Sequence, residues 1–165
     1  MNTTSDNLVR VNIRAVYMHP KHKVPTLFLA DEDDTFIISM VIGFLEAQSI
    51  IIGWQRLPSP RPTTADLVRL IIEDDFTARI EKVVITDVSE GAFMAKLIIH
   101  RGEQIIERDC RPSDALAIAV RANSPIYATE QVIEKIESEQ ENIRALIKYL
   151  EAEAKDADMN NMMQS

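Results

Sequence analysis

The chain has 165 residues, a net charge of −8 and an apolar share of 46%, which suits one globular domain with a hydrophobic core. No apolar run reaches the ~20 residues of a membrane helix, and residues 1–7 lack the layout of a signal peptide. We therefore expect a cytoplasmic protein without membrane contact. The acidic balance argues against broad binding of a phosphate backbone but leaves room for a small anion site. The lone Cys110 excludes an internal disulfide and a thiolate zinc site.

The first part of the chain predicts three strands, because apolar residues alternate with polar ones. We expect these strands at residues 8–17, 25–30 and 35–42. The acidic run Asp31–Asp34 fits a solvated turn between the second and third strands, with a divalent-cation site as the alternative. Gly43 interrupts the pattern, and residues 44–54 then predict a helix.

The middle of the chain predicts a helix followed by three antiparallel strands. A proline-rich loop precedes the helix, expected at residues 64–75, whose start has the capping-box pattern of Thr63 and Asp66. The strands are expected at residues 79–88, 92–100 and 104–110. Their short turns contain Gly91 and Gly102, as hairpin turns often do.

The last part predicts two helices around a short strand at residues 125–128. The first helix is expected at residues 114–122 with Ser113 as its N-cap. The second is expected from residue 130 to about 154, with a bend or split where its apolar stripe weakens at Gln140. Residues 155–165 read as a disordered acidic tail. The outer stripe favours self-association into a homo-oligomer, with folding back onto the chain's own sheet as the alternative.

This order of elements predicts an α+β fold with a mixed, largely antiparallel β-sheet, helices packed on it and a long C-terminal helix. The predicted organisation is a domain at residues 8–137 and a helical extension at residues 138–165.

Two Arg-Pro pairs stand at predicted helix starts, Arg61-Pro62 and Arg111-Pro112. Free backbone N–H groups at a helix start attract anions, and a preceding arginine adds a bidentate phosphate donor. Arg61 and Arg111 are therefore candidate phosphate-binding residues. The alternative is that each arginine pairs with a nearby carboxylate while the proline only sets the helix start.

Carboxylates near the ends of elements could converge on Mg²⁺ or Mn²⁺ for phosphodiester hydrolysis. These residues are Glu46, Asp66, Asp87, Asp109 and Asp114. Asp66 and Asp114 are also explained as acids in the first turn of a helix, and Asp87 and Asp109 as strand ends. Glu46 is the least explained, because it lies among apolar residues.

Four segments together resemble the bifunctional nuclease domain family of bacteria and plants. They are Val41–Ile50 with Gly43 and Glu46, Arg61–Leu67, Asp87–Ala95 with Gly91 and Phe93, and Arg111–Ala119. The resemblance covers roughly residues 8–137 and implies an α+β fold with DNase and RNase activity. One position departs from the pattern, since Ala65 stands where the family commonly has His.

The resemblance and the candidate residues together predict a metal-assisted nuclease that acts on nucleic acid. We expect Glu46, Asp87 and Asp114 to be catalytic and Arg61 and Arg111 to bind phosphate. Glu46, Asp66 and Asp114 are the candidate ligands of the divalent cation. Two alternatives stay open: a non-catalytic nucleic-acid-binding or regulatory module, and an oligomeric scaffold.

Overall fold

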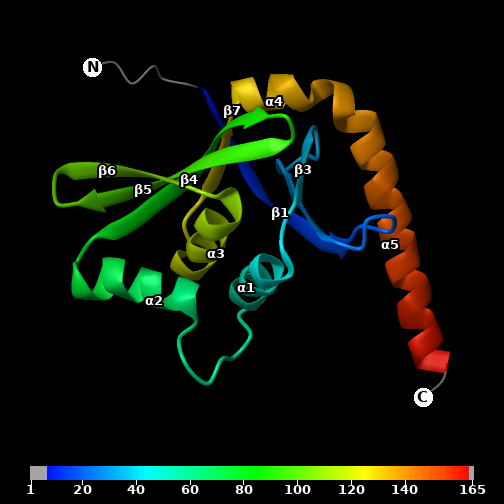
Figure 1. Cartoon of the computed structure of the whole chain (residues 1–165), viewed down its shortest axis with the longest axis horizontal. Helices are drawn as coiled ribbons and strands as arrows, with labels where there is room; N and C mark the ends of the chain where they lie inside the picture. Colours follow the sequence, from blue (N-terminus) through cyan, green and yellow to red (C-terminus); the bar gives the residue numbers. More distant parts are fainter. Residues whose placement is uncertain (1–6, 164–165) are drawn as a thin grey trace.

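A computed structural model describes residues 7–163, with the burial of side chains described up to Met159. Its centre is a seven-stranded sheet of order β3-β2-β1-β7-β4-β5-β6 (Figure 1). The strands are β1 Leu8–Met18, β2 Pro25–Ala30, β3 Ile37–Val41, β4 Arg79–Ser89, β5 Ala92–Arg101, β6 Gln104–Cys110 and β7 Ile126–Thr129. Neighbours are antiparallel except β4 and β7, which run parallel. The predicted α+β fold with a mixed, largely antiparallel sheet is confirmed.

The short strand β7 joins the two antiparallel halves of the sheet. It pairs with β1 on one side and β4 on the other. Two hydroxyl groups fix this position, since Ser124 donates to the Ile80 carbonyl at 2.6 Å and Thr129 to the Thr86 carbonyl at 3.0 Å. A parallel neighbour requires a crossover connection. The helix that precedes β7 supplies it and is thereby held against the sheet.

Three helices pack on one face of the sheet (Figure 1). They are α1 Phe44–Trp54, α2 Thr64–Leu70 and α3 Pro112–Ala122. The core between the sheet and these helices contains Leu27 and Leu29 of β2, Ile50 of α1 and Leu116 of α3. Burial of each such side chain stabilises the fold by about 1.5–3 kcal/mol.

Two helices differ in detail from the sequence prediction. The helix expected at residues 64–75 has the right span, but its second half, Ile71–Asp75, is a π-helix. The next helix begins at Pro112, two residues earlier than predicted, and its N-cap is Arg111. The prediction of Ser113 as N-cap was therefore wrong. Proline suits the first helical position, because the N–H it lacks would have no partner there.

The C-terminal region is helical with one break, as predicted at Gln140. It consists of α4 Glu130–Ile136, a 3₁₀ turn Glu137–Glu139 and α5 Gln140–Met163. The side chain of Gln140 pairs with the edge of β3: its Oε1 accepts the Ile37 N–H at 2.7 Å, and its Nε2 donates to the Ile37 carbonyl at 2.9 Å. The amide continues the hydrogen bonding of the sheet, which fixes where α5 begins.

The apolar stripe of α5 packs on the second face of the sheet. Ile143, Ile147 and Leu150 form a separate buried cluster with Phe28 of β2 and with three other sheet residues, Ala15, Ala30 and Ile37. Alternate residues of β2 thus face two different cores, which explains why its whole sequence is buried. The stripe folds back onto its own sheet, which was the alternative to self-association, and a homo-oligomer stays a prediction.

The end of α5 also differs from the expectation of a disordered tail. The helix continues to Met163 and extends past the sheet in Figure 1. Residues 155–163 are therefore helical, while residues 164–165 of the expected tail lie outside the described residues. No helix in the described part of the chain combines the length and hydropathy that a membrane crossing requires.

Candidate active site

Arg111 joins two carboxylates from different helices. It lies between β6 and α3, and its guanidinium binds both oxygens of Asp114, with Nε–Oδ2 at 2.7 Å and Nη2–Oδ1 at 3.0 Å. Its Nη1 also donates to Glu46 Oε1 at 3.1 Å. These carboxylates, Asp114 first, raise the pKa of Arg111. The Arg111 side chain is nevertheless 65% exposed, so it is accessible to a phosphate group from solvent.

The position of Glu46 depends on Gly43. Gly43 is the N-cap of α1, and Glu46 lies in the first turn. The Glu46 carboxylate folds back over Gly43 so closely that a Cβ at position 43 would overlap with it. The glycine therefore leaves the space in which this carboxylate meets Arg111. This explains physically why a Gly and a Glu stand three residues apart in this segment.

The starts of α1, α2 and α3 line a common groove of about 610 Å³. Its polar lining includes Glu46, Thr63, Thr64, Arg111, Ser113 and Asp114. A smaller pocket of about 270 Å³ also contains Glu46 and Arg111, beside Phe93 from β5. The groove is large enough for a nucleotide-sized ligand. Helix starts carry partial positive charge, which favours an anion in this place.

Ala65 also lies in this groove. It is only 7% exposed and belongs to the main core. Ala65, where the family commonly has histidine, thus lines the same groove as Glu46 and Asp114.

Asp66 lies in a second cluster and binds Arg121. Its Oδ1 accepts from Arg121 Nε at 2.5 Å, and its Oδ2 accepts from the Thr63 N–H at 2.7 Å, which confirms the predicted capping box. Burial alone would raise the pKa of Asp66, but the hydrogen bonds from Thr63 and Arg121 lower it below its usual value. Arg121 is only 5% exposed and also donates to the carbonyls of Ser49 and Ala117.

Asp87 is separate from both clusters. It accepts from Lys135 Nζ at 2.6 Å and from the Val88 N–H at 2.7 Å. The hydrogen bond from Lys135, with that from Val88, lowers the pKa of the Asp87 carboxyl. The structure thus brings Glu46 and Asp114 together but leaves Asp87 with α4.

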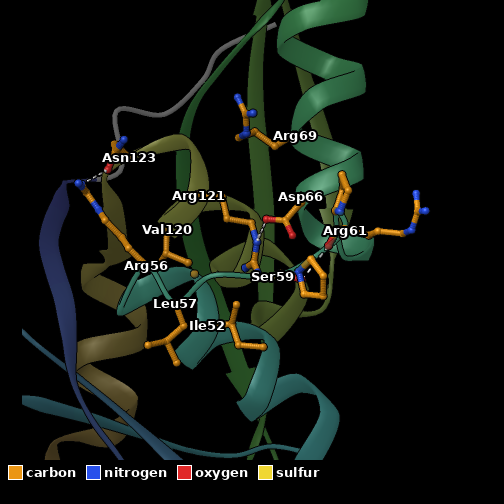
Figure 2. A pocket seen from close by; sticks show the side chains of 13 residues that line it. Ile52, Arg56, Leu57, Ser59, Arg61, Asp66, Arg69, Val120, Arg121 and Asn123 are labelled. Carbon is orange, nitrogen blue, oxygen red and sulfur yellow. Dashed lines mark hydrogen bonds and ion pairs between the residues drawn. The ribbon is translucent and has the colours of Figure 1, made fainter.

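Arg61 and Arg111 line different pockets. Arg61 lies on a pocket of about 480 Å³ together with Arg56, Arg69 and Arg121, which we call the arginine pocket (Figure 2). The sequence did not point to Arg56 or Arg121. A last-turn arginine such as Arg121 resembles an ordinary helix-end cation. Arg56 lies in the turn after α1, and nothing in the sequence indicates the left-handed backbone conformation of this residue.

No group of three or more His, Cys, Asp or Glu side chains in residues 7–163 is arranged to hold a metal ion. Glu46 and Asp114 are the two candidate ligands that meet here, at Arg111, and proteins often bind Mg²⁺ through one or two carboxylates while water and substrate phosphate complete the shell. Both carboxylates already face a single positive charge, that of Arg111.

Comparison with known proteins identifies the family. The model of the bifunctional nuclease domain matches residues 27–141, well over half of the chain. Two uncharacterized proteins from two strains of Mycobacterium tuberculosis are each 34% identical over 123 residues, which covers 74% of this chain and 73% of theirs. The fold and the groove thus occur in a nuclease-related domain. The chain belongs to the bifunctional nuclease domain family.

Proposed function

We propose that the chain is a nuclease that hydrolyses phosphodiester bonds of DNA or RNA in the groove at the starts of α1, α2 and α3. One observation supports this most: Arg111 is exposed and holds two carboxylates in a nucleotide-sized groove. Membership of a nuclease domain family supports the same reaction.

In this proposal Arg111 binds the phosphate at the bond to be cut. A guanidinium matches two phosphate oxygens as well as it matches a carboxylate. When the phosphate displaces Asp114 and Glu46 from Arg111, the two carboxylates become free to bind a metal ion or to accept a proton. The exchange costs little, because exposed ion pairs contribute only about 0–1 kcal/mol.

Glu46 and Asp114 would then hold Mg²⁺ or Mn²⁺. When bound, such an ion neutralises charge on the phosphate and makes a bound water more acidic. The two carboxylates orient the site, and either one can accept a proton from an attacking water once Arg111 has moved to the phosphate.

Asp66 and Asp87 have different roles in this proposal. Asp66 is a positioning residue, since it fixes Arg121 and so joins α2 to α3. Asp87 joins β4 to α4 through Lys135. Neither carboxylate lines the groove of Glu46 and Asp114.

Matched amides test these roles. The protein is incubated with labelled single-stranded and duplex DNA and RNA in Mg²⁺ or Mn²⁺, beside Glu46→Gln, Asp114→Asn and the control Asp109→Asn. Asp109 is an exposed acid on β6 outside the groove. We expect cleavage to fall at least tenfold in the first two variants and to persist in the control. Equal cleavage in all preparations would indicate a contaminating nuclease and contradict the proposal.

A non-catalytic nucleic-acid-binding module is the second candidate. The small Ala65 side chain in the groove favours it, because the proton acceptor that a histidine would supply is missing there. Binding of the same oligonucleotides without cleavage in any metal would favour this function over the first.

A further inference from the structure

The arginine pocket has no role in the reaction proposed above. It lies between the end of α1, the loop before α2 and the end of α3 (Figure 2). The pocket borders the groove, because Ile52 lines both. Four arginines line it, although acidic residues outnumber basic ones by 26 to 18 in the chain. Asp66 is the only acid among its described lining residues.

The four arginines differ in how far their charge is already balanced. Arg121 is buried and bound to Asp66, and Arg69 pairs with Glu73 at 3.2 Å. Among residues 7–163 the Arg56 side chain donates only to a neutral group, the Asn123 amide oxygen, at 3.0 Å. For Arg61 the described residues offer no carboxylate within ion-pair distance. Within the part of the chain that the structure describes, Arg56 and Arg61 therefore have no carboxylate partner.

The backbone at Arg56 supplies an independent observation. Arg56 has φ 53°, the left-handed conformation that favours glycine. Its N–H bonds to the Gly53 carbonyl and the Leu57 N–H to the Ile52 carbonyl, the pattern of a Schellman motif. Glycine is the usual residue at this position of the motif. A long cationic side chain here costs conformational energy, as does each of the five other described non-glycine residues with positive φ.

The rest of the pocket lining is mixed, with apolar side chains beside Ser59 and Asn123. Ile52, Leu57 and Val120 also line the pocket, and in Figure 2 the side chains of Arg56 and Arg61 extend to opposite sides of it. A site with cationic donors and some apolar side chains matches a nucleotide, whose phosphate is charged and whose base has apolar faces.

We propose that the arginine pocket binds one nucleotide unit, with the exposed side chains of Arg56 and Arg61 turning inward onto its phosphate and its base against Leu57. This inference rests on the proposed function, since it names where the nucleic-acid substrate is held beyond the bond that is cut. The unit is either a free nucleoside monophosphate or part of a strand. Arg61 is then a binding residue, but for a different phosphate from the one on Arg111.

Equilibrium binding tests the inference separately from cleavage. The probe is a fluorescein-labelled single-stranded DNA hexanucleotide, followed by anisotropy in excess chelator so that metal-dependent cleavage does not occur. The variants are Arg56→Gly, which removes the side chain and places the preferred residue in the left-handed turn, and Arg61→Ala. The control is Arg108→Ala, which removes one exposed arginine from β6 on the other half of the sheet.

We expect the double variant Arg56→Gly with Arg61→Ala to bind the probe on the order of tenfold more weakly than the control, because charge-assisted hydrogen bonds to phosphate are lost. The slope of log affinity against log salt should fall by ~0.7 for each lost phosphate contact. A purely structural role would not change this slope. Circular dichroism and the thermal midpoint verify that each variant is folded.

Competition by AMP shows whether the pocket binds a free nucleoside monophosphate or a unit of a strand. If AMP displaces the probe from the wild type but not from the double variant, the pocket takes a free nucleotide; if only longer strands compete, it takes a unit of a strand. Equal affinity of the double variant and the control, or no binding by the wild type, would overturn the inference. If the wild type cleaves nucleic acid but the double variant binds the probe as well as the control does, the binding role of the pocket is refuted and the nuclease reaction is not. If the pocket binds the probe but no cleavage occurs, only the nuclease reaction is refuted.

Discussion

Asp66 Oδ1 lies 2.5 Å from Arg121 Nε and so joins the first turn of α2 to the last turn of α3. The ion pair separates the groove of Glu46 and Asp114 from the arginine pocket, since Asp66 and Arg121 line only the latter. Arg121 also reaches the Ser49 carbonyl of α1. One buried guanidinium therefore holds together the three helices whose starts form the candidate active site.

The first prediction concerns this ion pair. Asp66→Asn removes the negative charge beside a guanidinium that is 5% exposed, so we expect a loss of about 2 kcal/mol in the free energy of unfolding. The pKa of Asp66 is lowered in the folded state, so its contribution is complete above the unfolded value of about 3.8 and is lost as pH falls further.

Urea unfolding from pH 7 to pH 2.5 measures both effects. The wild type and the Asp66→Asn variant should differ most at pH 7, and the difference should shrink below about pH 3.8. A difference that is constant over this range would show that the charge of Asp66 is not responsible.

The second prediction concerns Gly43. Gly43→Ala places a methyl group where Glu46 Oε2 lies, so the carboxylate must shift from its place in the groove. If Glu46 is catalytic, cleavage should fall on the order of a hundredfold, because small misplacements of catalytic groups are costly. The double variant Gly43→Ala with Glu46→Gln should be no less active than Glu46→Gln alone. An additional loss in the double variant would mean that Gly43 acts through some other group.

The third prediction concerns the packing of α1 on α3. A Cβ at Gly53 would lie 2.5 Å from Arg121 Nη1 and 2.7 Å from Val120 Cγ2, so Gly53→Ala forces the helices apart. We expect a loss of about 1–3 kcal/mol in unfolding free energy, as is typical of overpacking. The exposed control Gln55→Ala, at the end of the same helix, should stay close to the wild type. Equal stability of Gly53→Ala and the control would show that the helices adjust freely.

The fourth prediction concerns α5. Ile147 is 6% exposed in the cluster around Phe28, so Ile147→Ala should cost about 2–4 kcal/mol, whereas the exposed control Lys148→Ala should cost little. Because the stripe of α5 covers Phe28 and Ile37, truncation before Gln140 should expose that face and cause aggregation. A truncated chain that is as soluble and stable as the full chain would contradict the packing of α5 on the sheet.

Much of the fold follows from local patterns in the sequence. Alternation predicted the strands, and glycines in tight turns predicted the antiparallel pairs. The loss of apolar periodicity at Gln140 predicted the break before α5. The sequence could not show that Gln140 pairs with Ile37, because that contact joins residues 103 positions apart.

The candidate site was only partly predictable for the same reason. Glu46 stood out as an acid among apolar neighbours, and Arg111 and Asp114 as a motif at a helix start. Their convergence depends on how α1 packs against α3, which no local pattern encodes. Arg56 was missed because its left-handed backbone conformation is ordinarily signalled by glycine or asparagine.

The central claim is that Glu46 and Asp114 support metal-dependent cleavage of phosphodiester bonds. Its most direct test is the cleavage rate of a labelled single-stranded oligonucleotide, measured after chelation and again after stepwise addition of Mg²⁺ or Mn²⁺, for wild type and Asp114→Asn purified in parallel. We predict no cleavage in chelator, recovery with the metal in the wild type, and a much weaker recovery in Asp114→Asn. Cleavage that persists in chelator, or that recovers equally in both proteins, would contradict the claim.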